Sequence, residues 1–506
     1  MLRPIAQGKK VKVVLQRKLN TFDVTNLVVG SIIGADIYVA AAIGAKLVGP
    51  SSLIVWLVAG FMAIVIALSF SHCAMLMPRV GGPYAYVKEV SGRFPAFEVG
   101  WALLLAEWFS LAVFPVAFAQ YFVALVPGID PNGQVILKGV FILIIFLTNA
   151  FGIKAAGKFN DILTIVKLAP LVLLMVSGLF FFAFNSSQVA SNFQPFVTGD
   201  LGAFGQALVL IFWAYAGFEI STLPAEEVEK PERTIPKAIV LGMMIVIVFY
   251  LVTNFVIIGT VDQTSLSSTP SPLIDSSSQI FGSLGVLSWI VPLFIGVGAL
   301  ISILGADESG TIGTSRLSFA LSMDGLLPKS LSRLHGKYNT PYIGLVVICT
   351  TAFVASVFGG LTQLISTSVF LLSFTYLATS VSTIMLERKY REKSRNIKGK
   401  LSIPIAGILS SGLLLVMVDI QLIGFSLILL GIGVPIYAWF SPKKEMEALR
   451  EAFLSREAVL RRAYEQSERF LAYPIRRIKR WFYRRRNVVP AWKLEENIPG
   501  DNRPPL

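Results

Sequence analysis

Long apolar blocks fill the chain from about residue 20 to residue 440. Each is at least close to the roughly 20 residues that a helix needs to cross a hydrocarbon core about 30 Å thick. Backbone amides must be satisfied within such a segment, so helices are expected, and the alternating pattern of an outer-membrane barrel is absent. The sequence therefore predicts an all-α integral membrane protein with about twelve transmembrane helices, near residues 22–48, 52–77, 96–127, 134–153, 159–185, 204–224, 237–260, 283–314, 342–358, 361–386, 402–418 and 420–440.

Composition and charge placement agree with this pattern. The chain is 54% hydrophobic and 15% charged, whereas an average soluble chain carries about 25% charged residues. Its net charge of +14 would suit nucleic acid, but the basic residues cluster before the first block and after the even-numbered blocks. This alternation is the positive-inside rule. It predicts a multi-pass protein of the cell membrane with both termini in the cytoplasm and no nucleic-acid partner.

Two apolar blocks carry helix-breaking residues in their middle. Residues 30–38 read GSIIGADIY and residues 212–219 read FWAYAGFE, so each has glycine beside an acidic residue. Five blocks precede the second of them, which fits a five-plus-five inverted repeat followed by two extra helices. A broken helix frees amides at one end and carbonyls at the other, and a zwitterionic amino acid matches both. The alternative is that Gly30 and Gly34 only permit close helix packing.

The expected organisation follows from these blocks. Residues 1–20 form a basic cytoplasmic N-terminus, and residues 21–400 form a transport core with repeats at about 21–185 and 204–387. Residues 401–440 supply two additional transmembrane helices. The Ser- and Thr-rich stretch 261–282 is interpreted as a flexible connection. Residues 441–506 are expected to form a basic amphipathic cytoplasmic tail. This tail could bind anionic lipid. Alternatively, it could be solvated or pack on the protein's own loops.

Several motifs resemble those of one transporter family. Residues 30–38 resemble its G-x-I-I-G-S-G-I-F, and residues 78–86 (PRVGGPYAY) resemble P-x-x-G-G-x-Y-x-Y. Residues 212–236 resemble F-A-Y-x-G-F-E followed by A-E-E-x-x-x-P-x-R-x-I-P, and residues 315–328 resemble S-R followed by D-G-x-x-P. Together they resemble the amino acid permeases of the amino acid–polyamine–organocation superfamily.

The resemblance implies a leucine-transporter-like fold and secondary transport of amino acids or related amines. Carried over by position, it places Trp213 where some relatives hold an aromatic gate, and the alternative is an ordinary packed aromatic. The implied substrate-binding residues are Ile33, Gly34, Ala35, Asp36, Trp213, Ala214, Tyr215 and Gly217.

Asp36 departs from the family pattern, which has glycine at that position. Its carboxylate could cap the free amides of the second half-helix. It could instead attract a cationic substrate, which would favour a basic amino acid or a polyamine. A charge at the midplane costs roughly 3 kcal/mol on insertion scales, so some partner or use is expected.

Lys167 and Glu107 are the candidates for coupling transport to protons. Lys167 resembles the lysine that replaces a bound cation in proton-coupled relatives, and a desolvated lysine can titrate in a useful range; it could also snorkel to the interface. Glu107 could relay the proton or be satisfied by nearby hydroxyls. Gly30 and Ser302 would face the cation site, and the scarcity of hydroxyls around Ser302 favours protons over sodium.

The remaining chemistry-bearing residues give no sign of an enzyme. Cys73 and Cys349 have neither metal nor disulfide spacing, no nucleophile–base pair lies in the blocks, and no phosphate-binding loop is present. Asp307 and Glu308 are expected where water reaches the cytoplasmic half of their helix. We therefore expect a proton-coupled amino acid symporter without metal or cofactor, or a polyamine transporter, an exchanger or a non-transporting amino acid sensor. The expected partners are the substrate, protons and membrane lipids.

Overall fold

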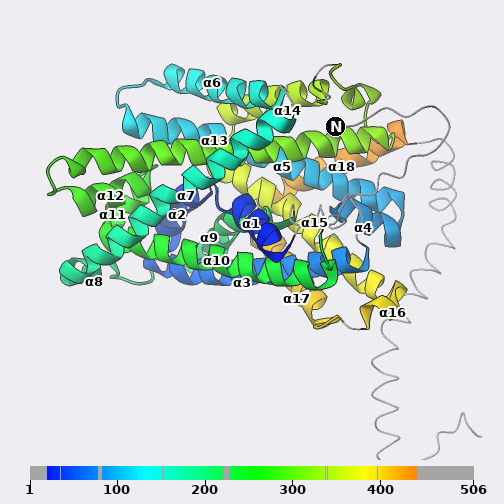
Figure 1. Cartoon of the computed structure of the whole chain (residues 1–506), viewed down its shortest axis with the longest axis horizontal. Coiled ribbons are helices and arrows are strands. Elements are labelled where there is room, and N and C mark those ends of the chain that lie inside the picture. Colours follow the sequence, from blue (N-terminus) through cyan, green and yellow to red (C-terminus); the bar gives the residue numbers. More distant parts are fainter. Residues whose placement is uncertain are drawn as a thin grey trace, which may run out of the picture. The chain divides into compact units, whose positions relative to one another are not determined.

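The computed structural model describes residues 20–34, 36–77, 82–150, 153–219, 228–336, 338, 340–395 and 397–441, without the side chains of 27, 153–167 and 231. Over these residues the chain is built of helices, and no β-strand occurs among them (Figure 1). One compact unit comprises Met1–Phe440, and the predicted tail forms a second unit that lies outside the described residues beyond Ser441. In order, the α-helices are α1 Thr21–Ile32, α2 Asp36–Val48, α3 Ser52–Leu76, α4 Gly82–Ser91, α5 Arg93–Leu125, α6 Pro131–Ala150, α7 Ile153–Phe184, α8 Ser186–Asn192, α9 Leu201–Phe212, α10 Pro231–Thr260, α11 Gln263–Ser268, α12 Pro272–Phe281, α13 Leu287–Met323, α14 Tyr342–Phe358, α15 Leu361–Lys389, α16 Arg391–Ser394, α17 Ser402–Met417 and α18 Ile420–Phe440.

Every predicted apolar block contains a helix. Within the described chain, seven helical stretches are long and apolar enough to cross a bilayer, and the pair Leu168–Phe184 and Ser186–Asn192, bent by 110°, makes an eighth candidate. Shorter apolar helices cover Leu201–Tyr215, Tyr342–Phe358 and Ser402–Met417. The chain is therefore a multi-pass helical membrane protein, while the number of twelve crossings stays a prediction.

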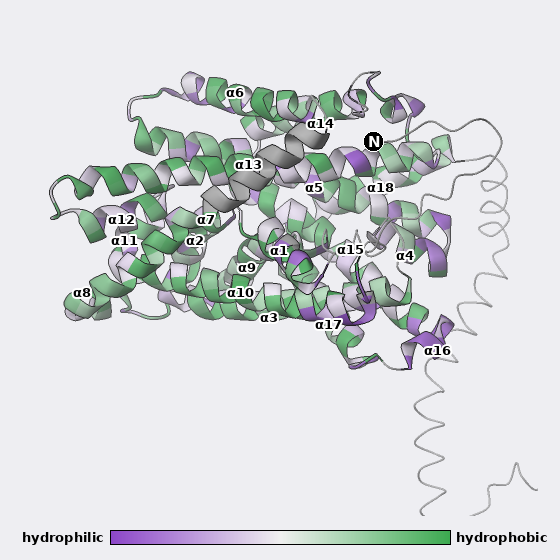
Figure 2. Ribbon diagram, viewed as in Figure 1, coloured by the Kyte–Doolittle hydropathy of each residue, from purple (hydrophilic) through white to green (hydrophobic). Residues whose placement is uncertain are grey.

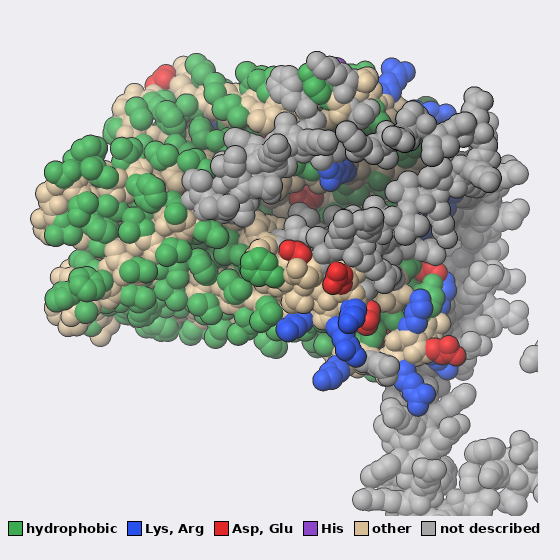
Figure 3. All heavy atoms as spheres, in the orientation of Figure 1, with side chains coloured by type: hydrophobic (Ala, Val, Ile, Leu, Met, Phe, Trp, Pro, Cys, Tyr) green, Lys and Arg blue, Asp and Glu red, His purple; other side chains and the backbone are tan. Residues whose placement is uncertain are grey.

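The surface agrees with a lipid environment. Large apolar side chains point outward from α7, where Phe180 is 69% and Phe184 73% exposed. Figure 2 shows hydrophobic helices through most of the chain, with hydrophilic residues concentrated at α4 and α16. On the viewed face, apolar side chains cover the region of α8 and α10, and most charged side chains gather toward α16 (Figure 3). Contiguous apolar surface of this kind is rare on soluble monomers and suits acyl chains.

The stretch 261–282 corrects one prediction. We expected a flexible connection, which is wrong, because it folds into α11 and α12. The Asp262 side chain caps α11 by accepting a hydrogen bond from the Ser265 amide, and Pro272 occupies the first turn of α12, where its missing amide costs nothing. Leu273 is fully buried and Ile274 is 8% exposed. The abundant Ser and Thr hid these signals.

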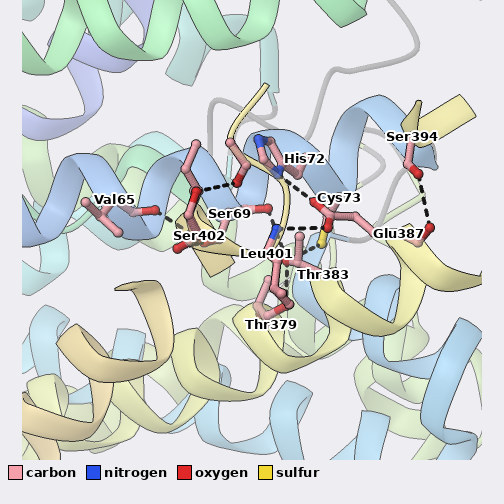
Figure 4. Close-up of polar contacts among 12 residues, drawn as sticks. Val65, Ser69, His72, Cys73, Thr379, Thr383, Glu387, Ser394, Leu401 and Ser402 are labelled. Atoms are coloured by element: carbon pink, nitrogen blue, oxygen red, sulfur yellow. Dashed lines mark hydrogen bonds and ion pairs between the residues drawn. The ribbon is translucent and has the colours of Figure 1, made fainter. Parts of the chain in front are cut away.

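A buried polar cluster ties α3, α15 and the start of α17 together (Figure 4). His72 Nδ1 lies 2.9 Å from Glu387 Oε1, and both residues are buried. The other carboxylate oxygen of Glu387 accepts a hydrogen bond from the Leu401 amide at 3.4 Å, and the Ser394 hydroxyl donates to the Glu387 carbonyl. Because these contacts join distant parts of the chain, the cluster ties the start of α17 to α3 and α15.

Candidate substrate site

The first predicted helix break is present. α1 begins with a capping box in which Asn20 accepts from the Asp23 amide and Asp23 accepts from the Asn20 amide. The helix stops at Ile32, because Ile33 is extended with ψ at 99°, and α2 starts at Asp36. A Cβ on Gly34 would lie 3.0 Å from the Ala306 side chain, so the break runs close against α13.

The second block also leaves the α-helical conformation where the sequence predicted. α9 ends at Phe212, a 3₁₀ turn covers Trp213–Tyr215, and Ala216 is extended with ψ at 156°. Gly217 has φ at +112°, and a Cβ there would meet the Ser31 carbonyl oxygen at 2.7 Å. Glycine is therefore required both for its conformation and for the backbone contact between the two interrupted segments. Residues 220–227, which follow, lie outside the described chain.

Tyr250 of α10 bridges the two breaks. Its hydroxyl lies 2.9 Å from the Ile32 carbonyl oxygen and 3.0 Å from the Ala214 carbonyl oxygen. Both carbonyls belong to the helix ends that a break leaves without an intrahelical donor. The Tyr250 ring is fully buried and packs on Trp56 and Tyr215 with centroids 5.1 and 5.2 Å apart. One side chain thus holds both helix ends in register.

A cavity of about 60 Å³ lies where the two interrupted segments meet α5, α13 and α15. A buried water needs about 10–15 Å³ by the same measure, so the space has room for several waters or for a polar group of a solute. Its lining includes Ser31, Asp36, Glu107, Trp213 and Gly217. Residues from both breaks and from three long helices therefore converge on one small polar space.

Three carboxyl groups line this cavity, from Asp36, Glu107 and Glu219. Asp36 and Glu219 are buried at 8% and 5% exposure. Glu219 Oε2 accepts hydrogen bonds from the Gly217 amide at 3.1 Å and from the Tyr376 hydroxyl at 3.2 Å. The turn that breaks the helix thus also fixes an acid at the cavity wall.

Aromatic rings form another wall. Trp213 is 2% exposed, and its indole nitrogen donates to the Ser110 hydroxyl at 3.0 Å. Phe114 lies beside it with ring centroids 5.8 Å apart. The Trp213 ring is held in place from α5 and faces the cavity together with Phe114 and Leu111.

The structure brings together only part of the predicted site. Asp36, Trp213, Gly217 and Glu107 line the cavity. Ile33 and Gly34 form the interruption between α1 and α2. Ala35 and the side chain of Lys167, which belongs to α7, lie outside the described residues.

The other predicted residues do not belong to the described lining of the cavity. The Ala214 carbonyl accepts from Tyr250, and the Tyr215 hydroxyl donates to the Trp56 carbonyl at 2.9 Å. Gly30 lies in the last turn of α1. Ser302 is fully buried on α13 beside the Tyr38 hydroxyl.

Sequence reasoning missed three residues that shape the site: Glu219, Tyr250 and Ser110. Glu219 ends the motif that marked the second break, which was a usable signal. Tyr250 and Ser110 are an isolated tyrosine and serine in apolar helices, and only the fold reveals their partners.

The acidic pair of α13 departs from its prediction. We expected water to reach Asp307 and Glu308, but they are only 1% and 0% exposed within the protein. Glu308 Oε2 accepts from the Thr148 hydroxyl at 2.6 Å and from the Asn149 side chain at 2.9 Å. Glu308 therefore faces α6, whereas Asp307 accepts from the Thr311 hydroxyl of its own helix at 3.2 Å. Neither residue belongs to the described lining of the cavity, although Ala306 and Ser309 on either side of them do. The prediction was wrong because helix packing, rather than depth along the helix, decides exposure.

A second cavity of about 380 Å³ lies beside α9, between the C-terminal ends of α2 and α17 and the N-terminal ends of α15 and α18. It carries charges of both signs, from Lys46 and Asp419. We take the smaller cavity as the candidate site because both helix breaks and the buried carboxyls converge there. Among the described residues, no group of three or more His, Cys, Asp or Glu is arranged to hold a metal ion.

Fold and site together define a helical membrane protein with a polar cavity between interrupted helices. The sequence profile of the amino acid permease family matches residues 19–440, most of the chain. The chain therefore belongs to the amino acid permease family.

Named relatives support the same family. The branched-chain amino acid permease BcaP of Bacillus subtilis is 28% identical over 449 residues, covering 85% of this chain and 94% of that protein. The human large neutral amino acids transporter small subunit 2 is 27% identical, covering 84% and 80%. The mouse b(0,+)-type amino acid transporter 1 is 28% identical, covering 78% and 81%. These relatives are permeases and transporters, not enzymes.

Proposed function

We propose that this chain is a secondary active transporter that moves amino acids across the cell membrane by alternating access, coupled to proton symport. The observation that carries the proposal is the cavity at the meeting point of two interrupted segments. Free helix ends offer dipoles to an ammonium and a carboxylate, and a rocking motion around such a site would expose it to each side in turn.

The proposal includes the arrangement of the bundle. Helices from α1 to α15 would form two inverted repeats, with α17 and α18 as additional spans and both termini in the cytoplasm. The interrupted helices then occupy the first position of each repeat. Broken helices in corresponding positions are typical of transporters built this way.

Proton coupling is assigned to Lys167, with Glu107 as a relay. A lysine within an apolar helix loses proton affinity and can substitute for a bound cation. One charge moving through 100 mV gains about 2.3 kcal/mol. At about 1.4 kcal/mol per tenfold, one proton per substrate supports roughly fifty-fold accumulation. That scale suits uptake without a nucleotide.

Uptake into proteoliposomes under an imposed pH gradient tests the proposal. The native protein should accumulate an amino acid, and Lys167→Ala should lose gradient-driven accumulation while keeping exchange across the membrane. Lys138→Ala is the matched control, because Lys138 donates to the Ser356 carbonyl at 2.7 Å in another part of the bundle. Accumulation by Lys167→Ala at the native level would remove this lysine from the mechanism. Binding with no uptake by the native protein would favour a sensor.

A further inference from the structure

The acids of the cavity come from three separate elements. Asp36 opens α2, Glu107 lies midway along α5, and Glu219 follows the 3₁₀ turn of the second break. All three residues line the same cavity. The fold thus brings one carboxyl group from each of three segments to the wall of a single cavity.

Glu107 differs from its neighbours in how it is held. Glu219 is fixed by Gly217 and Tyr376, whereas Glu107 receives no hydrogen bond from the part of the chain that the structure describes. A carboxylate removed from water is costly unless it is paired and hydrogen-bonded. Glu107 lines the cavity, where a solute could supply a partner for it.

The aromatic wall adds a second preference for cations. The Trp213 ring is fixed by its hydrogen bond to Ser110 and lines the same cavity, with Phe114 next to it. An ammonium or guanidinium group over such a ring gains about 0.5–2 kcal/mol. The carboxyl groups and the aromatic ring therefore both favour binding of a positively charged solute.

We propose that this cavity selects solutes of net positive charge, namely alkylammonium compounds such as a basic amino acid or an aliphatic diamine. This inference rests on the proposed transport function and names its substrate class. A neutral amino acid brings its own carboxylate toward three acids, whereas a second cationic group gives Glu107 a partner.

Binding to the purified full-length protein tests the selectivity. Radiolabelled lysine is bound and then displaced by unlabelled lysine, putrescine, leucine or glutamate. Lysine and putrescine should act at concentrations at least about tenfold below leucine, because a charge-assisted hydrogen bond contributes about 1.5–3 kcal/mol. Displacement by lysine without putrescine identifies a basic amino acid, and displacement by both identifies the wider amine class. Leucine binding more tightly than both would overturn the proposal.

Charge-removing variants assign the effect to the cavity. Glu107→Gln should weaken lysine binding by about tenfold or more and leave leucine binding within about twofold. Glu98→Gln is the matched control, because Glu98 lies on the same helix but faces Gly433 of α18. If Glu107→Gln does not yield folded protein, Asp36→Asn provides the same readout. If Glu107→Gln weakened lysine binding and leucine binding equally, the loss would reflect altered structure, and the assignment of cationic selectivity to the cavity would be contradicted.

Uptake measurements separate this inference from the transport proposal. Proteoliposomes that take up leucine, with no inhibition by lysine or putrescine, would preserve transport and overturn the cationic selectivity. Selective lysine binding without uptake of any solute would preserve the selectivity and overturn transport. Uptake of lysine that putrescine or excess lysine inhibits, and that Glu107→Gln reduces, is the expected result.

Discussion

Two buried acidic regions of this molecule are built on opposite principles. At the α3–α15 cluster, Glu387 faces His72 at 2.9 Å and also accepts the Leu401 amide, so the protein itself supplies its partners. At the cavity, Glu107 lines an open space together with two further carboxyls. The first arrangement is complete as it stands, and the second gains a partner when a solute enters.

The difference separates stability from recognition. A partnered acid in a packed cluster joins helices, so its loss should weaken the fold and leave selectivity unchanged. An acid at a cavity should affect selectivity before stability. Substitutions in each region can break or sharpen this contrast.

The largest effect on uptake is expected at Gly217, whose φ of +112° and contact with Ser31 allow the cavity to form. Gly217→Ala should abolish uptake, because a Cβ would lie 2.7 Å from the Ser31 carbonyl oxygen and strained backbone costs about 1–3 kcal/mol. Gly313→Ala is the control, since a Cβ there meets no atom within 4 Å. Proteoliposome uptake and thermal unfolding are measured for both variants. Uptake at the native level by Gly217→Ala would contradict the close contact between Gly217 and the Ser31 carbonyl.

His72→Ala should produce the opposite outcome, with lost stability and unchanged selectivity. Removing one partner of a buried pair costs about 3–5 kcal/mol, because the buried Glu387 carboxyl group loses His72 and keeps only the Leu401 amide. Replacing both residues by apolar ones, as in His72→Phe with Glu387→Leu, should restore much of this loss. Thermal unfolding gives the stability, and the lysine-to-leucine affinity ratio should stay constant. A changed ratio would erase the distinction between the two regions.

Tyr250→Phe tests the bridge between the helix breaks at a smaller scale. The ring can stay in its packing with Trp56 and Tyr215, but the single hydroxyl proton that the Ile32 and Ala214 carbonyls share is lost, at a cost of about 1–3 kcal/mol. We expect slower uptake and modestly lower thermal stability. Tyr342→Phe is the control, with a side chain 38% exposed. Indistinguishable behaviour of the two variants would exclude the bridge.

The smallest effect is expected at the half-exposed group of Tyr84, Lys88 and Asp324, outside the spans. Burial alone would raise the pKa of the Asp324 carboxyl, but hydrogen bonds from Tyr84 and Lys88 and the charges of Lys88 and Arg93 bring that pKa below its ordinary value. Its contribution is therefore present above an ordinary aspartate pKa of about 3.9 and is lost as pH falls through the lower folded pKa. Native protein should lose its small stability advantage over Asp324→Asn on acidification, and a pH-independent difference in thermal unfolding would contradict this.

Much of the architecture could be predicted from local patterns in the sequence. Block length and apolarity gave a helix in each of the expected segments, and glycine beside acid marked both interruptions. These signals are local, because each arises within one helix length.

The remaining features depend on contacts between distant residues. His72 and Glu387 are 315 positions apart, and Tyr250 reaches carbonyls in two other segments. The burial of Glu308 depends on how α13 packs against α6. α11 and α12 escaped notice because their caps are made of the same Ser, Asp and Pro residues that also mark loops.

Substrate protection of a cysteine in the cavity tests the central claim most directly. Ser309 lines the cavity on α13 and is partly exposed there, so Ser309→Cys should react with a small cationic thiol reagent. Ser268→Cys, on an exposed turn of α11, and the parent protein with its buried Cys73 and Cys349 provide the controls. We predict that a transported substrate slows modification of Ser309→Cys and leaves that of Ser268→Cys unchanged. Modification of Ser309→Cys at the same rate with and without a saturating, transported substrate would show that the solute binds elsewhere.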